Sequence, residues 1–415
     1  MEWKHYKMDE LIEEISMGPF GSDVKKEFYV DNGVPILNGS NLQGFKLKED
    51  SFGYLTKEKA DSLKKCNAHR GDIIVTHRGT LGQIVYVPVN SKYDRYVISQ
   101  SQFRFRCKAD LVDVQYLVYY FHTREGQYKI LANASQVGVP ALARATSTFR
   151  LIDIKLPPLD DQRRIASILS SLDRKIELNN KINADLEEMA QAIFKNWFVD
   201  FEPFKDGKFV DSELGMIPEG WKVGRTDDFY QINIGKTPPR KEHKWFSTNP
   251  ADKIWVSIAN MGNSGIFISD SSEYLTKEAV DRHNIIMVPR NTILLSFKLT
   301  VGRVAIADKE LTTNEAIARF ILSDDKYMEY LYLYLKNFDY NSLGSTSSIA
   351  TAVNSKTIKG MQMLQPSDKI IDAFHIQVNP IFEKIRSLTK ENSRLSLLRD
   401  TLLPRLMSGE LEVPE

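Results

Sequence analysis

The residues best suited to chemistry in this sequence lie in a short loop that carries cationic and hydroxyl side chains beside glycine. His77 and Arg78 stand between Thr76 and Thr80, and Gly79 separates Arg78 from the second threonine. Arginine can pair bidentately with the edge of a guanine, and threonine can hydrogen-bond to a base or to a phosphate. The loop therefore fits a contact with nucleic acid, and an ordinary solvated hairpin is the alternative for each residue.

A similar loop occurs again further along the chain. The heptapeptide at 76–82 aligns with 296–302, and the pentapeptide Tyr-Leu-Thr-Lys-Glu at 54–58 recurs unchanged at 274–278. Both matches have the same shift, 274 − 54 = 220 residues, which indicates that a whole domain is duplicated. The second loop offers Phe297, Lys298 and Thr300. Two copies of one scaffold with different tips predict two similar but non-identical targets.

Motifs for catalysis or for metal binding are missing from the sequence. It contains no G-x-x-x-x-G-K-[ST], no G-x-G-x-x-G and no H-E-x-x-H, and its seven histidines show no ligand spacing. The Asn/Asp-Pro-Pro-Tyr/Phe motif of amino-methylating DNA methyltransferases is also missing. We expect no catalytic residue, no metal site and no enzyme activity in this chain.

Other polar segments could also contact DNA. A Gly-rich turn precedes two lysines near residue 25, a more basic segment follows residue 235, and polar loops run through 133–144 and 344–348. The alternative is that the polar loops are only flexible connectors. The predicted DNA-contacting residues are Lys25, Lys26, Asn41, His77, Arg78, Thr80, Gln136, Arg144, Lys236, Arg240, Lys241, Asn260, Phe297, Lys298, Thr300, Ser345 and Thr346.

Composition places the chain among ordinary globular proteins. It has 415 residues, 42% of them hydrophobic, and a net charge of +1. This length suggests two or three domains, and the near-zero charge confines any phosphate-binding surface to a local patch. No apolar run approaches the roughly 20 residues that span a bilayer, and the first residues do not resemble a signal peptide. We expect a soluble cytoplasmic protein in which Cys66 and Cys107 are reduced core residues.

Two long stretches have the hydrophobic period of a coiled coil. Apolar residues recur at alternating spacings of four and three from Ile165 to Trp197 and from Phe374 to Leu406. We predict that the two helices pair antiparallel and that Asn183 and Asn392 face each other, or nearly so, and fix the register. A frayed, wet edge is the alternative. The predicted seam comprises Ile165, Leu169, Leu172, Ile176, Asn183, Leu186, Ile193, Phe374, Val378, Ile381, Ile385, Asn392, Leu395 and Leu402.

Together these patterns predict an α+β protein with an internal pseudo-two-fold repeat. Two mixed, strand-rich globular domains alternate with two long helices that form an antiparallel coiled coil. Paired β-rich runs at 72–87 and 292–307 and apolar helices at 116–121 and 330–335 belong to the globular domains. The predicted order is a first globular domain at 1–158, a helix at 159–200, a linker at 201–217, a second globular domain at 218–366 and a helix at 367–415.

Three segments resemble a known family. Residues 161–173 (DQRRIASILSSLD) resemble the start of the central conserved helix in specificity (S) subunits of type I restriction-modification systems. Residues 403–411 (LPRLMSGEL) resemble the C-terminal signature of that family, and residues 215–221 (GMIPEGW) resemble its usual entry into the second target-recognition domain. The repeated order of domain and helix matches as well.

The resemblance implies a non-catalytic protein that recognises double-stranded DNA. Each target-recognition domain would bind one half of a bipartite, asymmetric site. The coiled coil would set the spacer and dock two modification (M) subunits, which carry S-adenosylmethionine and methylate adenine. Restriction (R) subunits would use ATP and Mg, and no cofactor is expected in this chain. The alternatives are a specificity subunit with a different restriction partner and a coiled-coil scaffold that does not bind DNA.

Overall fold

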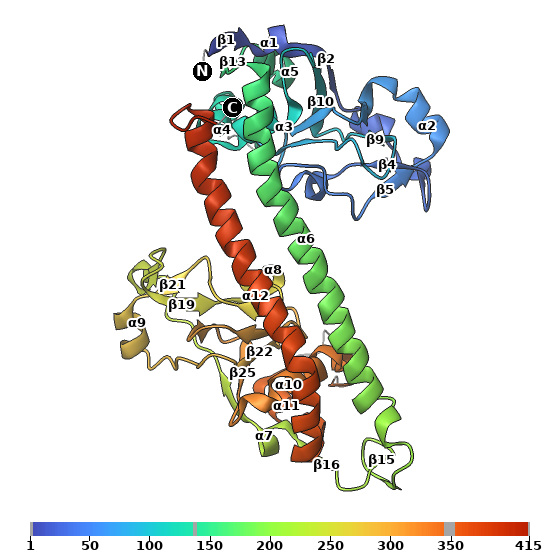
Figure 1. Cartoon of the computed structure of the whole chain (residues 1–415), viewed down its shortest axis with the longest axis vertical. Helices are drawn as coiled ribbons and strands as arrows, with labels where there is room; N and C mark the ends of the chain where they lie inside the picture. Colours follow the sequence, from blue (N-terminus) through green and yellow to red (C-terminus); the bar gives the residue numbers. More distant parts are fainter. Residues whose placement is uncertain (1–2, 136–138, 344–352, 414–415) are drawn as a thin grey trace. The chain divides into compact units, whose positions relative to one another are not determined.

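The structure, a computed structural model, describes residues 3–135, 139–343 and 353–413. The chain forms two compact units, and both combine sheets with a part of each long helix (Figure 1). Unit 1 comprises Met1–Ile176 with Arg394–Glu415, and unit 2 comprises Glu177–Ser393. The fold is mixed α/β, with two long helices and strand-rich domains.

Unit 1 is built on two sheets. The first has the order β2-β10-β7-β8, and all neighbouring strands in it are antiparallel. The second has the order β3-β5-β4-β9-β6, and β1 pairs separately with β13. The strands are β1 (Lys4–Lys7), β2 (Ile12–Met17), β3 (Tyr29–Val30), β4 (Val34–Ile36), β5 (Gly53–Leu55), β6 (Asn67–His69), β7 (Ile73–Thr76), β8 (Ile84–Tyr86), β9 (Arg95–Val97), β10 (Gln102–Cys107), β11 (Ala134–Ser135), β12 (Ala141–Leu142) and β13 (Asp153–Leu156).

Unit 2 also has two larger sheets. The five-stranded sheet, with the order β17-β25-β22-β23-β20, corresponds to the first sheet of unit 1, and a smaller sheet has the order β18-β21-β19-β24. β16 pairs with β26, and β14 with β15. The strands are β14 (Phe209–Val210), β15 (Ile217–Pro218), β16 (Lys222–Arg225), β17 (Gln231–Ile234), β18 (Phe246–Ser247), β19 (Lys253–Val256), β20 (Phe267–Ile268), β21 (Tyr274–Leu275), β22 (Ile293–Ser296), β23 (Val304–Ala307), β24 (Thr312–Thr313), β25 (Ile317–Ile321) and β26 (Gln362–Gln365).

Short helices cover the sheets. The predicted strand pair within 72–87 is confirmed as β7 with β8, and that within 292–307 as β22 with β23. The two predicted apolar helices are confirmed as α3 and α10. α3 packs on β8, and α10 packs on β22 and β23. Cys66 and Cys107 are free and buried, as predicted. The short helices are α1 (Met8–Leu11), α2 (Lys57–Ser62), α3 (Val114–His122), α4 (Arg124–Leu131), α5 (Ala145–Arg150), α7 (Thr226–Phe229), α8 (Ile258–Asn263), α9 (Lys277–Arg282), α10 (Met328–Asn337) and α11 (Ser355–Lys359).

The two long helices, α6 (Leu159–Phe198) and α12 (Asp368–Met407), have 40 residues each. At about 1.5 Å per residue, each is roughly 60 Å long. α6 begins directly after Pro157-Pro158, and α12 ends at Met407, three residues after Pro404 and short of the predicted boundary at 415. The predicted linker after α6 holds the β14–β15 pair, and Phe204 packs on Trp221 with ring centroids 5.1 Å apart.

The fourteen predicted seam residues are all buried or half-buried, but the buried ones belong to domain cores. Ile165 and Leu169 lie in one hydrophobic cluster with Leu406 and with the aromatic residues of α3. Phe374 and Val378 lie in the cluster that contains the apolar face of α10. Residues 172–186 of α6, apart from Asn179, and residues 389–402 of α12 are half-buried or exposed. Each long helix is therefore fixed mainly by the sheet domain that it packs on.

The partner of Asn392 is one helical turn away from the predicted Asn183. Asn179 is fully buried, and its Nδ2 donates to the Asn392 Oδ1 and to the Glu391 Oε2, both at 2.9 Å. The Asn392 Nδ2 donates to the Asn180 Oδ1 at 2.8 Å. Among the described residues, the Asn183 Oδ1 has no hydrogen-bond partner. The heptad pattern places both Asn179 and Asn183 on the same face of α6, so it could not decide between them.

The direction of the helix pair in unit 2 follows from two contacts. Asn179 meets Asn392, whereas Phe194 lies against Phe374 with ring centroids 6.3 Å apart. Residue numbers rise along α6 as they fall along α12, so these two segments run antiparallel. In unit 1 the Arg399 Nη1 donates to the Asp173 Oδ1 at 2.7 Å, and Tyr119 of α3 also donates to Asp173.

A second polar contact attaches α12 to the core of unit 2. Glu329 of α10 is fully buried, and its Oε1 accepts a hydrogen bond from the Asn379 Nδ2 at 2.8 Å. The His375 Nδ1 lies 2.8 Å from the Glu329 Oε2. Burial raises the pKa of the Glu329 carboxyl, although the hydrogen bonds from Asn379 and His375 oppose the shift. The native state thus binds the Glu329 proton more tightly than the unfolded chain does.

We predict that Asn179→Leu lowers the free energy of unfolding by about 1–2 kcal/mol, because the Oδ1 of the half-buried Asn392 loses its donor. Changing Asn392 to Leu in the same chain should recover most of this loss, since the unpaired Oδ1 is then removed as well. Chemical denaturation of the two single variants and the double variant measures the coupling. Asn183→Leu is the control and should change the free energy of unfolding less than Asn179→Leu does. A larger change for Asn183→Leu would support a pairing of Asn183 with Asn392.

We predict that Glu329→Gln raises the melting temperature by a few degrees at neutral pH. A raised native pKa means that Glu329 favours folding most below its unfolded pKa, near 4.5, and that this contribution is lost as the pH rises towards the native pKa. Glutamine mimics the protonated form, so the gain should be large at about pH 8 and small at about pH 4.5. Glu188→Gln, an exposed carboxylate on α6, is the control. A gain that does not depend on pH would contradict the explanation.

Candidate nucleic-acid interface

Strand direction brings several predicted loops of unit 1 to one edge of its first sheet. β2 and β7 end at the edge where their antiparallel neighbours β10 and β8 begin, as the pairs Met17↔Phe103 and Thr76↔Gln102 show. The segments that follow β2, join β7 to β8 and precede β10 therefore meet there. Their approach is close, because a Cβ on Gly18 would lie 1.9 Å from the Ser99 carbonyl oxygen.

The β7–β8 loop presents its cation and hydroxyl to the outside. Gly79 and Gly82 have φ values of +87° and +82°, which glycine adopts readily. Arg78 and Thr80 are exposed, and the Thr80 Oγ1 donates to the Gln83 Oε1 at 2.7 Å. His77 is half-buried, with its Nε2 3.2 Å from the Gln100 carbonyl oxygen. Burial lowers the pKa of His77, so its neutral ring suits a base better than a phosphate.

A second chain segment joins this loop through the main chain. The Gly79 N–H donates to the Pro140 carbonyl at 2.9 Å, and the Leu142 N–H donates to the His77 carbonyl at 2.8 Å. This pairing brings the exposed Arg144, which has a φ of +47°, to the same edge as Arg78. The predicted Gln136 lies outside the described residues.

Three other predicted residues of unit 1 differ in their placement. Lys25 and Lys26 are exposed beyond the turn after β2, and the Lys25 Nζ lies 4.0 Å from the Glu27 Oε1. Asn41 is fully buried, with its Oδ1 accepting from the Asn38 N–H and its Nδ2 donating to the Lys48 and Asp50 carbonyls. The prediction that Asn41 contacts DNA is therefore corrected, because its amide is already fully used in shaping its own loop.

In unit 2 the β22–β23 loop forms the corresponding edge. Lys298 and Thr300 are exposed, as a DNA contact requires. Phe297 is only 2% exposed and packs in the core of unit 2, while its N–H donates to the Ala316 carbonyl at 3.0 Å. The expected base contact by Phe297 is corrected for this reason; the side chain supports the loop from beneath. The fully exposed residue is its neighbour Leu299, at 99%.

The basic segment after β17 lies at the same edge of unit 2, but its cations are engaged. The Arg240 guanidinium pairs with both carboxylate oxygens of Glu273, at 2.8 and 3.1 Å, and covers the Phe246 and Trp255 rings. The Lys236 Nζ donates to the His283 carbonyl at 2.6 Å. A phosphate would have to compete with these partners.

The remaining predicted positions of unit 2 are less informative. Lys241 is exposed. Asn260 is half-buried and caps α8, where its Oδ1 accepts from the Ser257 N–H at 2.9 Å and its Nδ2 donates to the Ser272 Oγ at 3.3 Å. Ser345 and Thr346 lie outside the described residues.

Two exposed apolar side chains escaped the sequence prediction. Phe20, in the turn after β2, is 82% exposed, and Leu299 lies at the tip of the β22–β23 loop. The internal alignment contained a signal for Leu299, because it places this leucine on Gly79 while keeping Gly302 on Gly82. No comparable signal marked Phe20.

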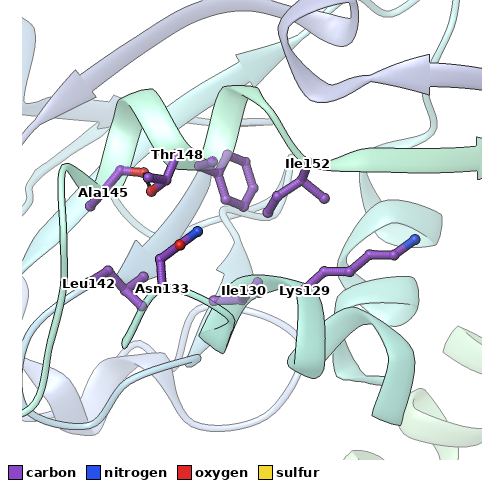
Figure 2. Close-up of a pocket in the computed structure, with 8 residues that line it drawn as sticks. Lys129, Ile130, Asn133, Leu142, Ala145, Thr148 and Ile152 are labelled. Carbon is purple, nitrogen blue, oxygen red and sulfur yellow. Dashed lines mark hydrogen bonds between the residues drawn. The ribbon is translucent and has the colours of Figure 1, made fainter. Parts of the chain in front are cut away.

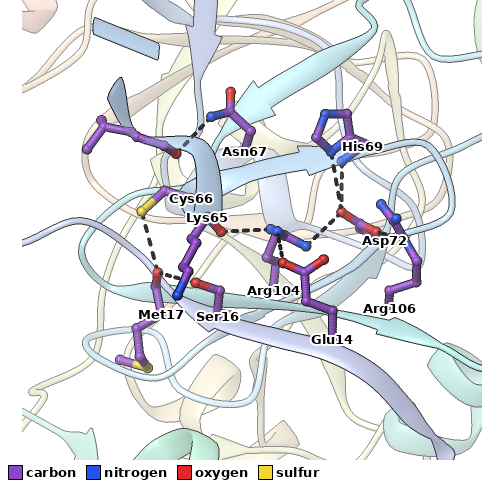
Figure 3. A network of polar contacts seen from close by, with 11 residues as sticks. Glu14, Ser16, Met17, Lys65, Cys66, Asn67, His69, Asp72, Arg104 and Arg106 are labelled. Carbon is purple, nitrogen blue, oxygen red and sulfur yellow. Dashed lines mark hydrogen bonds and ion pairs between the residues drawn. The ribbon is translucent and has the colours of Figure 1, made fainter. Parts of the chain in front are cut away.

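A buried arginine occupies an interior strand in each unit, Arg104 in β10 and Arg319 in β25. In unit 1 the Arg104 Nη2 donates to Glu14 at 2.6 Å and its Nη1 to Asp72 at 3.3 Å, and Arg106 also pairs with Asp72 (Figure 3). The hydrogen bond from Arg104 lowers the pKa of Glu14. This network holds the strands that carry the edge loops.

The corresponding arginine of unit 2 has different partners. Arg319 donates to the carbonyl oxygens of Ile286 and Ile234 at 2.9 and 2.8 Å. Within the described part of the chain, it makes no ion pair with a carboxylate, and burial lowers its pKa to about 10. Thr292 stands where unit 1 has Asp72 in the internal alignment.

One small cavity lies in unit 1. This cavity between α4 and α5, lined in part by Ile130, Asn133 and Phe149, has a volume of about 10 Å³ (Figure 2). This is space for one water molecule at most. Among residues 3–135, 139–343 and 353–413, no group of three His, Cys, Asp or Glu side chains could hold a metal ion. No helix in these ranges is sufficiently long and apolar to span a bilayer.

Known proteins share this organisation. Residues 1–188 and 218–375 match the family described as the type I restriction modification DNA specificity domain. The type I restriction enzyme HindI specificity subunit of Haemophilus influenzae is 26% identical over 99% of this chain and 100% of its own length. The MjaIX specificity subunit of Methanocaldococcus jannaschii is 29% identical over 100% of this chain and 94% of its own length.

A solved structure has the same fold. The S subunit of a type I restriction-modification system from M. genitalium superposes with a TM-score of 0.57 and 16% sequence identity, over 98% of this chain and 96% of the other. The two matched ranges make up most of the sequence, and each contains most strands of one unit and a part of a long helix. The chain therefore belongs to the family of type I restriction-modification DNA specificity proteins.

Proposed function

We propose that this chain supplies DNA sequence specificity to a type I restriction-modification complex and that each unit recognises one half of a bipartite, asymmetric site. The observation that carries the proposal is the pair of sheet edges. Both have a β-hairpin loop with positive φ at two aligned positions, 79 and 82 in unit 1 and 299 and 302 in unit 2. The exposed side chains on these loops differ, as two different half-sites require.

The long helices are proposed to set the distance between the two half-sites. We interpret α6 and α12 as an antiparallel coiled coil between duplicated domains, with the boundaries 1–158, 159–200, 201–217, 218–366 and 367–415. Support comes from the antiparallel contacts of Asn179 and Phe194 in unit 2 and from the seam residues, none of which is exposed.

The chemistry of modification and restriction is assigned to partner subunits. Two M subunits would dock on the helices and supply S-adenosylmethionine, and R subunits would supply ATP-dependent cleavage with Mg. This chain would be a non-catalytic subunit. Chromosomal DNA as the target implies that the complex works in the cytoplasm.

A coiled-coil scaffold that binds only proteins is the competing interpretation. It would leave Arg78, Arg144 and Lys298 without a role at their edges. For a DNA-binding protein, the logarithm of the binding constant for duplex DNA falls linearly with the logarithm of the salt concentration. A scaffold would show no such binding.

We predict that Arg78→Ala impairs recognition of one half-site and Lys298→Ala impairs recognition of the other. Methylome sequencing of cells that express the reconstituted complex first defines the site. Competition binding against duplexes mutated in each half then measures specificity. Loss of a base contact should cost about 1–3 kcal/mol and reduce discrimination at one position, whereas loss of a phosphate contact should weaken all duplexes and lower the salt slope by about one.

The matched control for this test is Asn41→Ala, whose buried amide should affect stability more than base preference. A wild-type complex that neither binds duplex DNA nor methylates a bipartite site would refute the proposed function. If Arg78→Ala and Lys298→Ala affect the same half-site, the assignment of one half to each unit is wrong.

We predict that adding seven residues to both helices, after Ile176 and after Ser393, lengthens the spacer and keeps both half-sites. These points are the boundaries of the two compact units, so each unit keeps its own helix segments. Seven residues add about 10 Å of helix, which corresponds to about three base pairs of duplex at ~3.4 Å each. Methylome sequencing reports the new spacer. Insertion into α6 alone is the control and should destabilise the protein; an unchanged spacer after the double insertion would contradict the model.

A further inference from the structure

Leu299 is the most exposed large apolar side chain of this protein among the described residues. It is 99% exposed, and its φ of +62° lies in the left-handed region. Both features are unfavourable, because leucine gains nothing from exposure to water and its Cβ is strained at positive φ. A residue that carries both costs in an exposed loop calls for a compensating interaction outside the chain.

The turn itself does not need a leucine. In unit 1 the aligned residue is Gly79, with a φ of +87°, and the glycines at 82 and 302 also have similar φ values. The closing hydrogen bonds correspond as well: Thr76 donates its N–H to the Gln83 carbonyl, and Ser296 donates its N–H to the Arg303 carbonyl, both at 2.9 Å. The same backbone therefore forms with hydrogen in place of the isobutyl group.

The surroundings of Leu299 indicate what it would contact. Lys298 and Thr300 flank it, and both are exposed. Phe297 packs beneath in the core and fixes the base of the loop. A cation and a hydroxyl suit a phosphate or a base edge, whereas an isobutyl group suits neither. The apolar group that DNA offers at a base edge is the 5-methyl of thymine in the major groove.

We propose that Leu299 recognises a thymine 5-methyl group in the half-site bound by unit 2. The inference rests on the proposed function and adds a specificity residue to it. Gly79 leaves unit 1 without this contact, so the two loops differ in the kind of base feature that they detect. Unit 1 detects polar base atoms through Arg78 and Thr80, and unit 2 adds an apolar contact at its tip.

The test uses the full chain in complex with its M subunits and a duplex that contains the methylated site. Leu299→Gly removes the side chain and suits the positive φ, so the melting temperature should not fall. Binding to the specific duplex should weaken about tenfold, as expected from the loss of a buried leucine contact. Leu299→Asn, which tolerates positive φ but is polar, should weaken binding similarly. Val89→Asn, another exposed apolar residue, lies beyond the opposite end of β8 and is the control.

Replacement of each thymine of the second half-site by deoxyuridine identifies the contact. At one position, loss of the methyl should weaken the wild-type complex about fourfold and should weaken Leu299→Gly hardly at all. The inference is overturned if Leu299→Gly binds its site as tightly as the wild type, if the wild type and Leu299→Gly lose affinity equally at every substituted thymine, or if the half-site has no A·T pair. Failure of the proposed function looks different, because the wild-type complex would then recognise no bipartite site.

Discussion

One interior strand in each unit, β10 in unit 1 and β25 in unit 2, hydrogen-bonds to an antiparallel neighbour on both sides. This constraint decides where the loops of Arg78 and Lys298 lie. Antiparallel order makes both neighbours end where the interior strand begins, so segments far apart in the sequence meet at one edge. The loop residues can then vary without disturbing the ladder, because their side chains are not part of the sheet. Arg78 and Lys298 are held by the same backbone arrangement although they differ in chemistry.

The long helices depend on the same domains. Ile165 and Leu169 complete the core of unit 1, and Phe374 and Val378 complete the core of unit 2. Burial of these side chains contributes far more than the polar contacts near the helix centres, such as Asn179 with Asn392. Those polar contacts are directional, however, and an amide pair is satisfied in one register only. Hydrophobic burial therefore attaches each helix to its domain, and the amides determine how the helices align in unit 2.

Sequence patterns predicted the helices and strands better than they predicted the contacts between side chains. The strands around Gly79 and the apolar helix at 116–121 followed from residue type and period, which are local properties. The choice between Asn179 and Asn183 depends on the offset of two helices whose paired residues Asn179 and Asn392 lie 213 positions apart in the sequence, and no local pattern contains that offset. Phe297 was assigned to the exposed tip because it aligns with His77, but the direction of its side chain depends on the space beneath the loop. Leu299 is absent from the predicted contacts because a leucine neither donates nor accepts a hydrogen bond, and only its alignment with Gly79 marks it.

Arg319 adds a difference between the units that no surface residue reveals. Arg319 is two residues from the start of β25, at the loop edge. Its described hydrogen-bond partners are carbonyl oxygens, so none of them is a carboxylate that would cancel its charge. Arg104 in unit 1 is neutralised by Glu14 and Asp72. Because the described partners of Arg319 carry no charge, it adds a positive potential at the edge of unit 2, whereas the charge of Arg104 is compensated in unit 1. Encounter rates with a polyanion would then differ between the two edges before any base is recognised.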